Sequence, residues 1–78
     1  NIINQDLVPG PGCLYSLGTS DNRWGNLYTC DVNMSNEGSQ NEVDGTWGSW
    51  TMQEGEEDLF LINRRSGKKY KFLLEEIK

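Results

Sequence analysis

The chain has 78 residues, a formal net charge of −5 at pH 7, two cysteines and no histidine. It has neither a basic surplus that could follow a phosphate backbone nor a long apolar run, so its composition argues against nucleic-acid binding and membrane insertion. The commonest general base is absent and the cysteines lack a zinc spacing. We therefore expect no enzyme, no catalytic residue, no cofactor and no metal.

The length of the chain limits what it can bury alone. A lone domain of this size buries only about 60% of its unfolded surface. Ordering costs about 1.5 kcal/mol per residue, which leaves a net stability near zero without further support. Oligomerisation is the remaining source of stability. The chain begins with Asn1 rather than Met, and we expect it to be a piece of a longer or processed protein.

The first part of the chain is expected to be extended. Residues 1–12 contain a bend at 9–12, because its two prolines cannot donate to a sheet. A short strand is expected at 13–17, followed by a tight polar loop at 18–22. Two roles are open for Arg23, which can stack on an aromatic ring or donate hydrogen bonds to loop carbonyls.

Residues 24–34 alternate in polarity, which predicts a strand. The side of this strand that we expect to be buried carries four residues, Tyr28, Cys30, Val32 and Met34. For Cys30 and Cys13, two buried thiols and a disulfide are both open.

The second half predicts a three-stranded meander after a polar linker. The linker, 35–45, has one apolar residue and marks the boundary between a strand and loop module at 1–34 and a β-meander at 46–78. Strands are expected at 47–53, 59–62 and 68–74. An acidic turn at 54–58 joins the first two, and a turn at 63–67, with Gly67 in the left-handed conformation, joins the last two. The predicted fold class is therefore all-β with short antiparallel strands.

Three polar or aromatic groups are candidate binding sites. The acidic turn at 54–58 lacks the spacing of an EF-hand, so we favour a solvated turn over a Ca²⁺ site. The basic turn formed by Arg64, Arg65, Lys68 and Lys69 can meet an acidic glycan or a lipopolysaccharide phosphate, stay solvated, or meet the acidic turn of a neighbouring protomer. Trp47 and Trp50 suit sugar stacking or, alternatively, core and interface packing.

Two segments carry a resemblance to known proteins. Tyr15-Ser16-Leu17-Gly18 and Asn22-Arg23-Trp24-Gly25-Asn26-Leu27-Tyr28-Thr29, preceded by Asp6-Leu7-Val8-Pro9, resemble the YxLG…RWxxLY segment common in bacteriophage tail fibres and tailspikes. Residues 44–72 resemble the closing segment of some phage virion proteins, cyanophage-like ones especially. Self-cleaving fibre-tip chaperones have a Ser-Asp motif and a nearby Lys where this chain has Met34-Ser35-Asn36-Glu37, so the resemblance carries no self-cleavage to Ser35.

The resemblance implies a structural virion protein, assembled in the bacterial cytoplasm, that contacts other virion proteins and connects or caps a fibre. A strand at 59–62 that is apolar on both faces needs cover from a second subunit, so we expect an oligomer. The resemblance to tail fibres implies that this oligomer is an intertwined homotrimer. Its inter-subunit core is expected to contain Trp24, Tyr28, Val32, Trp50, Phe60, Ile62, Tyr70 and Phe72. The alternatives are a fibre tip that binds host-surface carbohydrate through Trp47, Trp50, Arg64 and Arg65, and a head or neck decoration protein.

Overall fold

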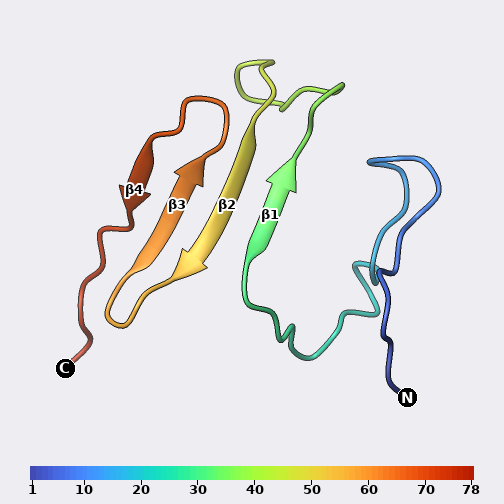
Figure 1. The fold of residues 1–78 in the computed structure, drawn as a ribbon, viewed down its shortest axis with the longest axis horizontal. Coiled ribbons are helices and arrows are strands. Elements are labelled where there is room, and N and C mark those ends of the chain that lie inside the picture. Colours follow the sequence, from blue (N-terminus) through green and yellow to red (C-terminus); the bar gives the residue numbers. More distant parts are fainter.

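The computed structural model describes residues 1–78 and contains strands but no helix. Its four strands are β1 (Val32–Ser35), β2 (Ser49–Glu54), β3 (Leu59–Asn63) and β4 (Lys69–Lys71). Each strand pairs antiparallel with the next, in the order β1-β2-β3-β4 (Figure 1). The predicted all-β class and the meander of β2, β3 and β4 are confirmed, and β1 adds a fourth strand. None of the segments forms a helix long and apolar enough to cross a membrane.

The strand expected at 24–34 forms only at its end, as β1. In the register of β1 and β2, Val32 lies opposite Met52. Continuing upstream, only Asp31 and Cys30 would still lie opposite β2 residues, Gln53 and Glu54, before the chain turns at Gly55, so residues 24–29 have no partner for ladder hydrogen bonds. In the single chain the expected buried side is largely exposed for the same reason, and Tyr28 is 91% exposed. Residues 13–17 likewise form no strand.

Neither alternative for the cysteines is met. Cys13 and Cys30 are both exposed, and they form no disulfide with each other. The loop that they flank is nevertheless ordered by local hydrogen bonds. The Thr19 amide donates to the Asn22 carbonyl at 3.0 Å, and Arg23 Nη1 donates to the Ser20 carbonyl. Of the two roles open for Arg23, the structure shows the donor role.

The segment expected as a linker connects two neighbouring strands of one sheet. The Asn36 amide donates to the Gly48 carbonyl at 3.3 Å, and the Gly48 amide donates to Asn36 Oδ1 at 2.8 Å. These bonds extend the β1–β2 pairing by one step beyond the strands. The segment 35–45 is therefore an organised connection, and β1 belongs to the same sheet as the meander.

Both predicted hairpin turns are present. In the acidic turn, the Gly55 amide donates to the Asp58 carbonyl at 2.8 Å. In the turn between β3 and β4, the Gly67 amide donates to the Asn63 carbonyl at 2.7 Å, and Asn63 Oδ1 accepts from the Arg65 amide at 2.9 Å. Gly67 has φ 78°, which confirms the predicted left-handed conformation.

The sheet is a single layer with two different faces. Alternation along the paired strands places seven apolar side chains together, here called the apolar face: Val32, Met34, Trp50, Met52, Leu59, Leu61 and Tyr70. The opposite side, here called the mixed face, carries Asn33, Thr51, Gln53, Phe60, Ile62 and Lys69. Only Thr51 and Ile62 are buried in the whole chain. The expected cover on both faces of 59–62 is therefore absent from the single chain.

Residues 1–31, here called the arm, lie beside β1 and beyond the edge of the sheet (Figure 1). The radius of gyration is 15.6 Å, whereas a compact domain of this length has about 11.5 Å. The accessible surface is 7848 Å², against about 4,800 Å² for a compact protein of this mass. The single chain thus leaves about 3,000 Å² more surface exposed than a compact fold would.

Candidate functional site

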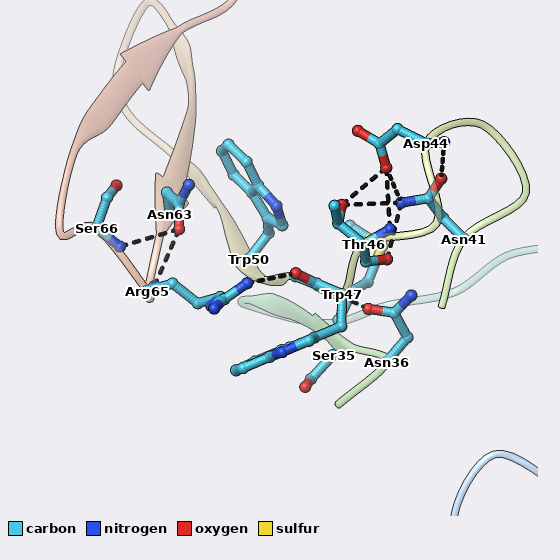
Figure 2. A pocket seen from close by; sticks show the side chains of 12 residues that line it. Ser35, Asn36, Asn41, Asp44, Thr46, Trp47, Trp50, Asn63, Arg65 and Ser66 are labelled. Atoms are coloured by element: carbon cyan, nitrogen blue, oxygen red, sulfur yellow. Dashed lines mark hydrogen bonds between the residues drawn. The ribbon is translucent and has the colours of Figure 1, made fainter. Parts of the chain in front are cut away.

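A polar hollow of about 780 Å³ lies at the end of the sheet where the β1–β2 connection approaches the β3–β4 turn (Figure 2). Its walls come from three segments that are distant in sequence: the end of β1, the connection up to Trp50, and the turn after β3. The antiparallel register brings them together, because Met34 lies opposite Trp50 and Trp50 lies opposite Asn63.

Arg65 and Trp47 form the most tightly defined contact at the hollow. The Arg65 guanidinium carbon lies 3.8 Å from the centroid of the Trp47 ring, and Nη1 donates to the Trp47 carbonyl at 2.9 Å. The turn that Asn63 stabilises presents Arg65 at this position, and in Figure 2 its side chain extends towards the Trp47 backbone. A guanidinium over an indole is an attractive cation–π arrangement. One face of Trp47 is therefore already occupied by a group of the same chain.

Trp50 stands on the apolar face beside the hollow. Its ring centroid lies 5.8 Å from that of Tyr70, with the two planes tilted by 41°. A Cβ atom on Gly48 would lie only 2.9 Å from Trp50 Nε1, so the indole occupies space that any larger residue at Gly48 would take. Glycine at this position therefore permits the observed place of the Trp50 ring.

A cluster of local hydrogen bonds organises the wall formed by the connection. Asn41 Oδ1 accepts from the amides of Val43, at 2.7 Å, and Asp44, at 2.9 Å. Asn41 Nδ2 donates to Asp44 Oδ1 at 2.8 Å, and Asp44 Oδ1 also accepts from the Thr46 hydroxyl at 2.8 Å. Hydrogen bonds to the Asp44 carboxylate lower the pKa of Asp44 because they stabilise its ionised form. The bond from the Asn41 side chain has the largest effect, followed by those from the hydroxyl and amide of Thr46.

Several polar atoms that line the hollow have no partner within the chain. The side-chain amide nitrogens of Asn36 and Asn63 make no intramolecular hydrogen bond, although their oxygens accept from backbone amides. Indole rings beside neutral hydrogen-bonding groups suit a polyhydroxylated ligand. The structure contains no group of three or more His, Cys, Asp or Glu residues that could hold a metal ion.

The residues predicted as glycan contacts divide between two places. Trp47, Trp50 and Arg65 all line the hollow. Arg64 does not, because its Nε donates to Thr51 Oγ1 at 3.0 Å on the mixed face. Sequence reasoning missed the asparagines of the hollow, although their tendency to form side chain-to-backbone turns was a usable signal.

The residues predicted as an inter-subunit core fall into three groups. Trp24, 68% exposed, and Tyr28, 91% exposed, lie in the arm. The sheet carries five more, with Val32, Trp50 and Tyr70 on the apolar face and Phe60 and Ile62 on the mixed face. Phe72 follows β4, and its amide donates to the Leu59 carbonyl at 3.0 Å.

The fold thus defines a class, a small antiparallel single-sheet protein with a tryptophan- and asparagine-lined hollow at one end. Comparison of the chain with protein-family models, with curated proteins and with solved structures gives no match in any of the three.

Proposed function

We propose that this chain is a structural, non-enzymatic module of a bacteriophage tail fibre or tailspike. In this proposal three copies associate, and the assembled module connects the fibre shaft to its tip or caps the fibre. The YxLG…RWxxLY resemblance supports the assignment to a virion fibre. The single observation that supports association is the large surface that one chain leaves exposed.

The size of that surface matches a permanent interface. The chain exposes 7848 Å², about 3,000 Å² more than a compact protein of its mass. Permanent subunit interfaces bury about 2,000–5,000 Å² in total, which is about 1,000–2,500 Å² per partner, so the excess on one chain is large enough for more than one such interface. Much of the excess is apolar, since the exposed large side chains include Ile2, Leu7, Leu14, Trp24 and Tyr28. Burying apolar surface is worth about 25 cal/mol per Å², so association supplies the stability that one chain lacks.

Light scattering on the purified chain tests the proposal directly. We expect a particle of three times the 8.9 kDa chain mass. Its unfolding midpoint should rise with protein concentration, because association stabilises the folded state by mass action. A monomer that unfolds cooperatively at a concentration-independent midpoint contradicts the proposal.

Receptor binding is the second candidate, and the hollow favours it. In that case the hollow takes a host-surface carbohydrate, with one ring stacked on an indole and its hydroxyls bound by the free amide groups of Asn36 and Asn63. The side of Trp47 opposite Arg65, and the partly exposed Trp50, are the available aromatic surfaces. The proposed class of ligand is an uncharged or weakly acidic glycan.

Two alanine variants separate the candidates. If Trp50→Ala and Trp47→Ala dissociate the oligomer in light scattering, both indoles act in assembly. If the variants keep the oligomer but lose binding on a glycan array and adsorption to cells, the hollow is a receptor site. Val43→Ala, at a side chain that is 95% exposed, is the matched control and should change neither.

A further inference from the structure

We infer that the arm of one copy covers the apolar face of a second copy, so that each subunit completes the core of its neighbour. This inference rests on the proposed association and specifies the two surfaces that form it. Both surfaces belong to the same chain, and in the single chain they do not meet.

The apolar face is a continuous surface that the chain leaves partly exposed, with Val32, Trp50, Met52 and Leu61 half-buried on it. Val32, Met52, Leu61 and Tyr70 form one row across all four strands, because each is the register partner of the next. Met34 is 50% exposed and Tyr70 is 47% exposed, although both lie on the sheet. A sheet normally packs its apolar side against a second layer, and here the chain supplies none.

The arm carries the complementary apolar material. Its exposed large side chains are Ile2, Ile3, Leu7, Val8, Leu14, Tyr15, Leu17, Trp24, Leu27 and Tyr28. All of them are at least 62% exposed. An arm of this length reaches up to about 100 Å when extended, whereas a four-stranded sheet is only about 20 Å wide. The arm is therefore long enough to cross the face of a neighbouring sheet.

The point where the arm joins the sheet favours a neighbouring copy over the arm's own sheet. Asp31 directly precedes β1, and its carboxylate accepts a hydrogen bond at 3.2 Å from Gln53 Nε2. Gln53 lies on the mixed face, so this bond holds the root of the arm to the side opposite the apolar face. The arm then extends past the edge of β1 and away from its own sheet (Figure 1). Exchange of an element between identical subunits is a low-cost route to a closed assembly.

Photo-crosslinking in mixed oligomers tests the exchange. The full chain is made in light and in isotopically heavy form, with a photoreactive phenylalanine in place of Tyr28, and the two forms are refolded together in equal amounts. We expect products that join position 28 to β2 or β3 peptides at Met52 or Leu61, with roughly half of them pairing a heavy with a light chain, as random mixing of identical subunits requires. The same probe at Val43, exposed but outside the arm, should yield few such products.

The other outcomes overturn the inference and are distinguishable from failure of the proposed function. Products that pair only light with light and heavy with heavy show that the arm folds onto its own sheet. Heavy–light products that map to Phe60 or Ile62 show that the arm covers the mixed face, while association itself stands. A monomeric mass in light scattering contradicts both the inference and the proposed association.

Discussion

Replacing Thr51 with valine tests whether the mixed face is held together by hydrogen bonds. Thr51 is the most deeply buried side chain, at 1% exposure. Its hydroxyl donates to Asn33 Oδ1 at 2.6 Å and accepts from Arg64 Nε at 3.0 Å. It thereby links β1, β2 and the start of the β3–β4 turn. Valine fills nearly the same volume and favours strands, so the substitution removes the two hydrogen bonds and little else.

The expected loss of stability follows from these two bonds. Each hydrogen bond contributes about 1 kcal/mol net. Asn33 and Arg64 are exposed and can bind water once the hydroxyl is gone, which reduces the cost. We therefore expect Thr51→Val to lower the free energy of unfolding by about 1–2 kcal/mol. In a domain of this size that corresponds to a fall in Tm of roughly 5–15 °C.

Urea or thermal unfolding at one fixed protein concentration measures the effect, because the proposed association also changes the midpoint. A double-mutant cycle with Asn33→Ala isolates the bond between Asn33 and Thr51. The cost of Thr51→Val should fall by about 0.5–1 kcal/mol in the Asn33→Ala background. Thr51→Ser keeps the hydroxyl, so its cost should not depend on that background. A Thr51→Val protein as stable as the parent, or an equal cost in both backgrounds, refutes the reasoning.

Two further predictions concern the loops. Gly67→Ala should lower the free energy of unfolding by about 1 kcal/mol in a urea titration, because residue 67 has φ 78°. Gly25→Ala is the control: residue 25 has open space around it and no left-handed φ, so this variant should stay within about 0.5 kcal/mol of the parent. Folding lowers the pKa of Asp44 below 3.8, so its contribution to stability is present above about pH 4 and is lost as the pH falls through the folded-state pKa. Asp44→Asn should therefore show a shallower loss of Tm between pH 5 and pH 2 than the parent, and identical profiles would contradict the assigned hydrogen bonds.

The meander could be predicted because its signals are local. The apolar run of β3, the glycine at 67 and the acidic turn each favour one structure through their own backbone and side-chain preferences. For this part of the chain the structure changes only the residues at which the strands begin and end. The returning strand, expected to reach residue 74, ends at Lys71, and Leu74 is 64% exposed.

The remaining features depend on contacts between segments that are distant in the chain, which the local sequence does not specify. Alternation at residues 24–34 predicts a strand wherever a neighbour exists, but β2 turns at Gly55 before it can pair with most of that segment. The hollow could not be predicted for the same reason. Trp47 and Arg65 were each singled out in the sequence, whereas their contact at 3.8 Å arises from the register of β2 and β3.

β4 is only three residues long and includes two lysines, Lys69 and Lys71. A short outer strand bearing positive charge is a poor template for adding another chain edge to edge. Growth of the sheet into an open-ended ladder is thus discouraged on that side. In the proposed assembly, copies meet through their faces instead, which leaves this outer edge unpaired.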